Sequence, residues 1–435
     1  MMKHFTLRKL VLSAALCFSC LLANAYDFEV DGIYYEITSA ADLTAQVTYK
    51  SSSYNSYSGD IVIPDTVVYG GHTLSVTAIG ASAFRKCSDL KSIILGNSVK
   101  SIGSSAFYYC SGLKEIALPN AVRSIGTNAF EYCTSLVSAT IGDSLKSIGK
   151  YAFRRCTSLN EINLPDALTS IGDEAFYYCS SLTSIVIPDA VTSIGTSSAG
   201  GAFGYCSSLI NATIGDGVTS IERETFYKCT SLKEVSLPDA LTSIGSSAFY
   251  GCTSLASVVI PNAVTSIGDY AFEYCDSLTT LTIGDFVSSI GTSAFLYCTA
   301  LTDVYSLNST PPSYSSSSDC FSMLAYLLAT LHVPADAVDT YAAATMWKEF
   351  NTIVGDAETA GISAVNVDND NYKVSADGGM VNVTGLGNGE RMTVYTADGR
   401  MVGAMAADGG SASISAPKGV AIVRVGNKTL KVAVH

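Results

Sequence analysis

A repeat of 23 residues constrains this chain more than any other feature of its sequence. Cysteine marks the repeat at Cys87, Cys110, Cys133, Cys156 and Cys179 and, after a four-residue insertion, at Cys206, Cys229, Cys252, Cys275 and Cys298. A fixed period of this length is typical of stacked coils, each of which buries its apolar side only against its neighbours. We therefore expect a solenoid, whose function lies on a long, regular surface and not in a catalytic pocket.

One repeat contains two inward-facing segments and a closing turn. Leu159, Ile162 and Leu164 define a short strand, with Glu161 and Asn163 directed outward. The other inward positions of this repeat are Leu168, Ile171, Ala175, Phe176 and Cys179. The spacing of the last three suits a single helical or 3₁₀ turn. The predicted fold class is thus a leucine-rich repeat solenoid of short strands and tight turns.

A longer period is hidden inside the short one. The strand ends in Ile-Gly at Ile141, Ile214 and Ile283, whereas most other repeats end in Leu-Pro or Ile-Pro. The two separations are 73 and 69 residues, and both become 69, or three repeats, once the four-residue insertion is removed. We infer that the array grew by duplication of a three-coil block, so that a repeated functional surface should recur every three coils.

The repeat cysteines are expected to be free thiols. Stacked coils place equivalent residues about 4.8 Å apart with their Cβ atoms pointing the same way, whereas a disulfide needs Cβ atoms about 3.8 Å apart that face each other. The ten cysteines should form a buried column of small hydrophobic side chains. A spacing of 22 intervening residues is also not a zinc-ligand spacing.

The first 25 residues have the pattern of a secretory signal peptide. Lys3, Arg8 and Lys9 precede an apolar segment, and Ala23-Asn24-Ala25 forms a small-residue cleavage site. A lipoprotein signal at Cys20 is the alternative, but Cys17 stands where such a signal has an aliphatic residue. No other stretch is apolar enough to span a membrane, so we expect an exported protein.

The charge balance limits the class of partner. The net charge is −13, and removal of the three cations of the leader makes it −16. Charged residues make up 14% of the chain, and no basic stripe is evident along the sequence. Nucleic acid and anionic lipid are therefore not expected as partners.

The repeat cycle resembles the BspA-like leucine-rich repeat family of bacterial surface proteins. The cycle is Ile-Pro-Asp-x-Val-x-x-Ile-Gly-x-x-Ala-Phe-x-x-Cys-x-x-Leu, as in residues 187–209 around the insertion, and it covers residues 79–306. Residues 26–78 and 307–356 resemble the N-terminal and C-terminal caps of that family. The resemblance implies adhesion to host extracellular-matrix proteins or to other bacteria.

The C-terminal part of the chain has a different sequence pattern from the repeats. A polar linker, residues 357–371, is followed by alternating strands and Gly/Asp turns that predict a small antiparallel β-sandwich over residues 372–435. The run from Val394 to Arg400 and the run from Pro417 to Val423 resemble the C-terminal (Por) sorting domain of the type IX secretion system of Bacteroidota. This resemblance implies that secretion machinery recognises the domain and that the protein reaches the cell surface, in association with the outer membrane, or the extracellular medium.

Signatures of catalysis are not found in the sequence. The histidines that follow the leader are His72, His332 and His435, and none forms a repeated constellation with cysteine or serine. There is no glycine-rich phosphate loop, and cysteines among apolar residues should be inert. We expect no enzyme, no cofactor and no metal site.

Three surface features are candidate binding sites. The first is the outward face of the repeat strands, whose candidate residues are Glu115, Glu161, Asn211, Glu234, Thr280 and Tyr305. The alternative is an ordinary solvated sheet face, since Ser, Thr and Val suit β-structure. The insertion Thr196 to Gly201 is a third, weaker candidate, because insertions in solenoids emerge as loops.

The second feature is a tyrosine that directly precedes the repeat cysteine. This tyrosine stripe consists of Tyr109, Tyr132, Tyr178, Tyr205, Tyr274 and Tyr297. Aromatic rings at the spacing of stacked coils suit sugars or protein side chains, and the alternative is that the rings pack over the coil edges and cover the thiols. We expect an adhesin-like protein that binds a macromolecule through its strand face. The alternatives are a structural spacer without a specific ligand and a glycan-binding module that uses the stripe.

Overall fold

The computed structural model describes residues 25–52, 54–196, 200–314 and 319–357, and then 373–377, 380–387, 391–396, 401–407, 410–416, 419–425 and 428–434. Nearly all of the predicted signal peptide 1–25 and of the linker 357–371 lies outside these residues. So do residues 197–199 of the insertion and residues 397–400 and 417–418 of the sorting-like motifs. The chain divides into two compact units, Met1–Gly355 and Asp356–His435, which are described separately.

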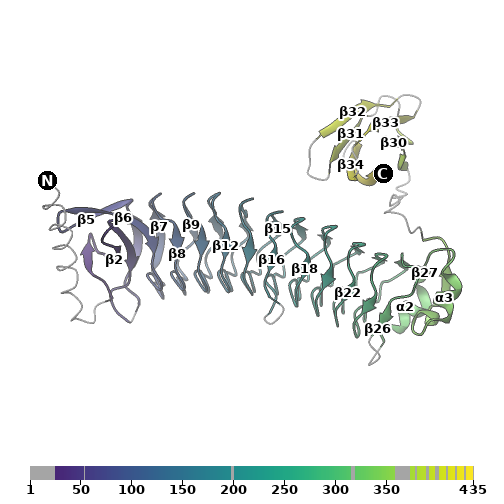
Figure 1. Cartoon of the computed structure of the whole chain (residues 1–435), viewed down its shortest axis with the longest axis horizontal. Helices are drawn as coiled ribbons and strands as arrows, with labels where there is room; N and C mark the ends of the chain where they lie inside the picture. Colours follow the sequence, from purple (N-terminus) through teal and green to yellow (C-terminus); the bar gives the residue numbers. More distant parts are fainter. Residues whose placement is uncertain are drawn as a thin grey trace. The chain divides into compact units, whose positions relative to one another are not determined.

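The first unit is a solenoid of stacked coils (Figure 1). Each coil contributes one strand of two to six residues, called the longer strand here, a second strand of two residues and a closing corner. The longer strands are β4 (Gly59–Ile63), β7 (Leu90–Leu95), β9 (Glu115–Ala117), β11 (Ser138–Thr140), β13 (Glu161–Ile162), β15 (Ser184–Ile187), β17 (Asn211–Ile214), β19 (Glu234–Ser236), β21 (Ser257–Ile260), β23 (Thr280–Ile283) and β25 (Asp303–Ser306). The predicted solenoid of 23-residue coils with little helix is confirmed.

The two-residue strands form a second face of the coils. They are β8 (Ser101–Ile102), β10 (Ser124–Ile125), β12 (Ser147–Ile148), β14 (Ser170–Ile171), β16 (Ser193–Ile194), β18 (Ser220–Ile221), β20 (Ser243–Ile244), β22 (Ser266–Ile267), β24 (Ser289–Ile290) and β26 (Ser313–Tyr314). From β8 to β16 and from β18 to β24, each pairs in parallel with the next, so serine stacks on serine and isoleucine on isoleucine. The ladder is interrupted between β16 and β18, where the insertion lies.

A column of phenylalanines runs through the core. From Phe84 to Phe321, the rings of successive coils stack with centroids 5.0–5.5 Å apart and nearly parallel planes. Phe176 and Phe203 stack at 5.3 Å across the insertion, so the core continues past it. Because each ring has a partner above and below, the whole apolar pattern must recur in every coil.

The repeat cysteines are buried and free, as predicted. They are also hydrogen-bond donors: the Cys156 thiol donates to the backbone oxygen of Phe130 at 3.1 Å, and the Cys206 thiol to that of Phe176 at 3.2 Å. Burial raises the pKa of the Cys206 thiol to about 12. A protonated thiol is a poor nucleophile and a poor metal ligand, so this column is structural.

The closing corner is a series of tight turns. The Ala106 N–H donates to Gly103 O at 3.2 Å and the Cys110 N–H to Phe107 O at 3.1 Å, which is the i→i+3 pattern of a 3₁₀ turn. Ser105 (φ 56°) and Tyr109 (φ 60°) are left-handed, so no helix continues through the corner. This conformation directs the Phe107 N–H to Ala129 O of the next coil, at 2.7 Å.

A mixed β-sheet covers the N-terminal end of the solenoid. It consists of β1 (Phe28–Val30), β2 (Ile33–Ser39), β3 (Thr44–Thr48), β5 (Thr66–Tyr69) and β6 (His72–Ile79). Strand β3 pairs with β6, which pairs with β8. The Tyr57 ring lies 4.6 Å from the Phe84 ring, so the first phenylalanine of the column is covered by an aromatic side chain.

The C-terminal end is covered by short helices. Two strands, β27 (Thr330–His332) and β28 (Thr352–Val354), extend the sheet, and α2 (Met323–Leu328), α3 (Val338–Ala343) and the 3₁₀ helix η1 (Trp347–Glu349) pack around them. Phe295 N–H donates to Cys320 O at 2.9 Å, which places Cys320 in the alanine position of an additional coil and Phe321 in the phenylalanine column. Trp347 packs edge-on against Phe321 at 5.8 Å.

The second unit contains two antiparallel sheets, which fits the predicted small sandwich. One sheet has the order β29 (Lys373–Asp377), β30 (Met380–Thr384) and β33 (Ser411–Ser415); the other has the order β32 (Met401–Ala406), β31 (Arg391–Thr396), β34 (Gly419–Val425) and β35 (Lys428–Val434). Its core includes Val381, Val383, Met392, Val394 and Val423, all fully buried. Neither unit contains, in its described residues, a helix long and apolar enough to cross a membrane.

Candidate functional site

The strand face is the outward surface of the longer strands β4 to β25. In β9, β13 and β19 the glutamates Glu115, Glu161 and Glu234 are exposed, and Asn211 in β17 is exposed as well. Thr280 and Tyr305 are half-buried. Among the described residues, none of the three glutamates takes part in an ion pair. Their charges are thus available to a partner.

Hydrogen bonding along the strand face is interrupted at regular intervals. The longer strands form separate sheets with the orders β4-β7, β9-β11-β13, β15-β17-β19 and β21-β23-β25-β27-β28. These breaks in backbone pairing, called openings below, lie between β7 and β9, between β13 and β15, and between β19 and β21. Each follows the previous one by three coils, so the three-coil period inferred from the sequence is also a period of this surface.

The residue that follows each strand explains two of these openings. Gly142 and Gly215 lie so close to the proline turn of the preceding coil that a Cβ atom would approach Pro119 O to 2.6 Å and Pro188 C to 2.6 Å. Glycine thus lets these coils approach closely enough for their strands to pair. Where one proline-ended strand follows another, as at Pro165 with Pro188, this approach is not available and the strands separate.

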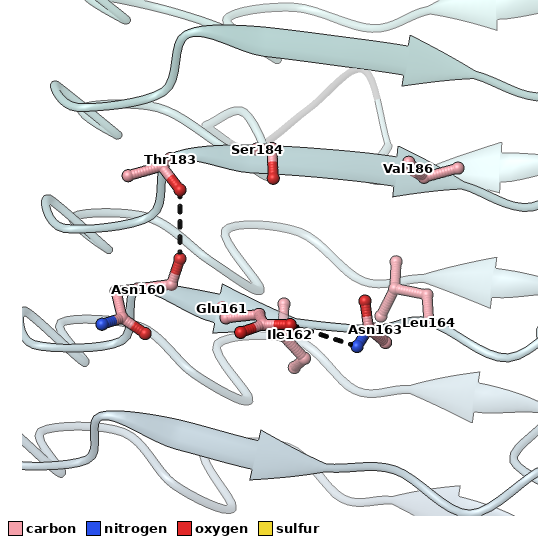
Figure 2. A pocket seen from close by; sticks show the side chains of 8 residues that line it. All are labelled: Asn160, Glu161, Ile162, Asn163, Leu164, Thr183, Ser184 and Val186. Carbon is pink, nitrogen blue, oxygen red and sulfur yellow. Dashed lines mark hydrogen bonds between the residues drawn. The ribbon is translucent and has the colours of Figure 1, made fainter.

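The opening between β13 and β15 is a groove of about 500 Å³ (Figure 2). Its walls are Asn160, Glu161, Ile162, Asn163 and Leu164 of one coil and Thr183, Ser184 and Val186 of the next. Thr183 remains close to Asn160, with its N–H 3.4 Å from the Asn160 backbone oxygen. The amide of Asn163 lies 3.5 Å from Oε1 of Glu161 and restrains that carboxylate. The coils thus stay joined at one end of the groove.

At each of the two proline openings, one strand carries an exposed carboxylate and the next strand carries an exposed valine. Glu161 and Val186 form the first pair, and Glu234 and Val259 occupy the equivalent strands at the second opening. Val186 is 62% exposed and Val259 39% exposed. At three coils apart, the two pairs are separated by roughly 14 Å along the solenoid, before the small effect of the insertion. The face therefore repeats one chemical unit, an anion beside an apolar patch.

The far end of the strand face is occupied by contacts within the chain. Asp303 lies 3.3 Å from Nε2 of His332, and the ring of Tyr305 stacks on His332 with centroids 4.2 Å apart. Of the predicted candidates, Tyr305 is thus part of the packing of the C-terminal cap. Glu161 is the candidate that the structure places inside a groove, together with Asn160, which the sequence analysis did not single out.

The tyrosine stripe is a series of stacked rings on the closing corners. Tyr109 stacks on Tyr132 (4.3 Å), Tyr178 on Tyr205 (4.4 Å) and Tyr274 on Tyr297 (4.6 Å). The Arg155 guanidinium lies between two of these pairs, 5.4 Å from Tyr132 and 4.9 Å from Tyr178. Each pair thus covers one face of both rings, and Arg155 lies over the second face of Tyr132 and Tyr178, while Tyr109 remains 41% exposed.

The pairing of the rings limits how the tyrosine stripe could bind a sugar. A sugar stacks on the open face of an aromatic ring, and in each stacked pair one face of every ring is covered by the other ring. All six tyrosines also have a left-handed backbone, with φ between 60° and 62°. The ring stacking stabilises the corners, and it leaves fewer open ring faces for a sugar than six separate rings would have.

The comparisons with known proteins agree with this repeat structure. Residues 77–200 and 199–324, more than half of the chain, match the BspA type leucine rich repeat region, in six copies. The chain belongs to the BspA type leucine-rich repeat family. No curated protein matches it.

Several solved structures are similar to this BspA type chain. A leucine-rich repeat protein from Bacteroides ovatus is 27% identical, with a TM-score of 0.33, over 64% of this chain and 94% of that protein. A T. pallidum leucine-rich repeat protein is 28% identical, with a TM-score of 0.39, over 53% and 90%. A leucine-rich cell surface protein from Faecalibacterium prausnitzii is 25% identical, with a TM-score of 0.32, over 67% and 95%. The match to the BspA type repeat region makes this chain a leucine-rich repeat scaffold.

Proposed function

We propose that this protein is an exported, surface-exposed scaffold that binds another macromolecule through its strand face. The observation that carries the proposal is the recurrence of a carboxylate opposite an exposed valine at the openings beyond β13 and β19. A partner with cationic and apolar side chains would complement this arrangement, as the core of a protein interface combines apolar contact with a few oriented polar groups.

Repeated binding sites along the solenoid would provide the affinity for the partner. A single opening offers few contacts, but two equivalent openings on one rigid frame, and many copies of the protein on a cell, would bind a multivalent partner with avidity. Extracellular-matrix proteins are partners of this kind, and the family resemblance favours them. The leader and the sorting-like C-terminal unit would bring the scaffold to the cell surface.

The experiment that tests this function is a binding array. The mature chain, residues 26–435, is applied to immobilised extracellular-matrix proteins and to a glycan array. Saturable binding to a matrix protein supports the proposal. Binding to glycans alone favours a glycan-binding module, and failure to bind either, with the protein folded by circular dichroism, favours a structural spacer.

Export is tested separately. Expression of the complete chain in a Bacteroidota host that has a type IX secretion system should place the protein outside the cell. Deletion of residues 372–435 should retain it in the periplasm if these residues are a sorting domain. Unchanged export of the deletion variant would contradict that role.

A further inference from the structure

Three cations form a ladder on the second face of the solenoid. Lys100, Arg123 and Lys146 each directly precede a two-residue strand, and all three are exposed. The Arg123 N–H donates to Lys100 O at 2.8 Å, and the Lys146 N–H donates to Arg123 O at 2.8 Å. The residues thus lie directly above one another, about 4.8 Å apart. Because successive cations are 23 residues apart in the sequence, the basic stripe is not apparent along the chain and forms only when the coils stack.

The fold does not require cations at these positions. In the six following coils the same column carries Thr169, Thr192, Thr219, Thr242, Thr265 and Ser288. Hydroxyls of this column donate to the backbone of the coil before: Thr169 Oγ1 to Lys146 O at 2.9 Å and Thr242 Oγ1 to Thr219 O at 2.8 Å. Like charges opposite one another on neighbouring strands destabilise a sheet. A basic ladder therefore replaces side chains that suit the scaffold better.

Of the three turns that lead to the ladder, two are uncharged and the third, before Lys146, carries Asp143. Within the described residues, none of the three cations forms an ion pair. The turns that lead to Lys100 and Arg123 carry the neutral Asn97 and Asn120. The equivalent turn residue is aspartate in the five coils that follow, at Asp143, Asp166, Asp189, Asp216 and Asp239. The N-terminal part of this face is thus a local positive patch on a chain of net charge −13.

We propose that Lys100, Arg123 and Lys146 bind a linear anionic polysaccharide, such as a sulfated glycan, that runs along the solenoid axis. The length of one sugar residue in an extended chain is close to the spacing of the coils, so successive acidic groups can meet successive cations. The column of threonines and the neighbouring column of serines continue this line with hydroxyl groups that suit sugar hydroxyls. The site is separate from the strand face and does not depend on the function proposed for it.

The same geometry disfavours nucleic acid as the polyanion. Proteins that bind single strands combine cations with aromatic side chains on which the bases stack. The outward positions of this face in the three coils are Lys100, Arg123 and Lys146 with Ser101, Ser124 and Ser147, and none is aromatic. A polysaccharide needs no such platform.

The test uses heparin as the probe and a variant that copies the protein's own ladder. In K100T/R123T/K146T, threonine takes the place that it has in five later coils, so the variant should fold, which its thermal unfolding midpoint will verify. The matched control, K91T/K114T/K233T, removes the same charge from three exposed lysines on the strand side of the coils. Binding is measured by calorimetry on the mature chain at several salt concentrations.

The unaltered protein and the control should bind heparin, and the ladder variant should bind at least about tenfold more weakly. Its plot of log affinity against log salt should be shallower by about two, at roughly 0.7 per cation removed. Equal losses in both variants, equal binding of desulfated heparin, or tighter binding of single-stranded DNA than of heparin would each overturn the proposal.

Discussion

The thiol of Cys179 donates a hydrogen bond to the backbone oxygen of Phe153 in the preceding coil, over 3.1 Å. The same contact recurs along the column, from Cys110 with Phe84 (3.0 Å) to Cys298 with Phe272 (3.2 Å). The cysteine thus couples each coil to the one before it, in addition to filling the core. This accounts for a cysteine, and not a valine or alanine, at the marker position of the repeat.

Replacing one of these thiols should weaken the stack locally. Cys179→Ala removes a fully buried sulfur and its hydrogen bond, and we expect the free energy of unfolding to fall by about 1–3 kcal/mol. Urea unfolding followed by circular dichroism measures the change. The control is Ser184→Ala on the exposed strand face, which should alter stability by less than about 0.5 kcal/mol. Equal stability of Cys179→Ala and the unaltered protein would contradict the role of the thiol.

The thiol column also predicts a loss of stability in alkali. The ordinary pKa of a cysteine here is 9.0, burial raises the pKa of Cys206 to about 12, and burial also raises the pKa of Cys179 and Cys229 well above 9.0. Between about pH 9 and 12 the unfolded chain loses thiol protons that the folded chain keeps. The free energy of unfolding should therefore be fully present below pH 9 and fall above it, by about 1.4 kcal/mol per pH unit for each such thiol.

Unfolding midpoints in urea at pH 8, 9, 10 and 10.5 measure this dependence. Cys206→Ala removes one of the titrating groups, so its stability should decline less steeply, by about one proton. A stability that stays constant from pH 8 to 10.5 would show that the buried thiols do not titrate in this way.

The left-handed conformation of the corner predicts which of two substitutions at Lys86 gives the more stable protein. Lys86 has φ 60° and is exposed, and the equivalent residue of a later coil is Gly251, with φ 67°. A side chain in this conformation costs about 1–2 kcal/mol, and glycine avoids that cost. We expect Lys86→Gly to be more stable than Lys86→Ala by about 1 kcal/mol in thermal unfolding. If Lys86→Ala is the more stable of the two, the strain argument fails.

The stacked tyrosines should contribute to stability and not to sugar binding. The variant Y178A/Y205A/Y274A breaks two ring pairs, each worth about 0.5–1.5 kcal/mol, so its unfolding midpoint should fall. Its binding on a glycan array should match that of the unaltered protein. Loss of a glycan signal in a variant that remains folded would restore the stripe as a glycan-binding surface.

The sequence predicts the solenoid well because the core leaves little freedom. Every coil must supply a phenylalanine such as Phe176 and a cysteine such as Cys179 at fixed positions, and any local departure would expose a neighbour. The period of three coils was also readable from the alternation of Ile-Gly and Leu-Pro strand ends.

The groove and the basic ladder could not be predicted from the sequence in the same way. The groove depends on how closely two coils approach at Pro165 and Pro188. This distance cannot be predicted from the residue types alone. The ladder depends on residues separated by a whole repeat, such as Lys100 and Arg123, which become neighbours only after the coils stack. The pairwise stacking of the tyrosine rings, in contrast, agrees with the coil spacing that the repeat predicts.

The central claim, that the strand face binds a macromolecular partner, is tested most directly by a charge-matched pair of variants. E115Q/E161Q/E234Q neutralises the strand face, and D143N/D166N/D239N neutralises three exposed aspartates in the turns of the coils. Both are compared with the unaltered mature chain in surface plasmon resonance, on the matrix protein that binds best in the array. We expect the glutamate variant to bind at least about tenfold more weakly and the aspartate variant to bind almost normally, since rim charges contribute little. Undiminished binding of the glutamate variant, or the same loss in both variants, would contradict the account.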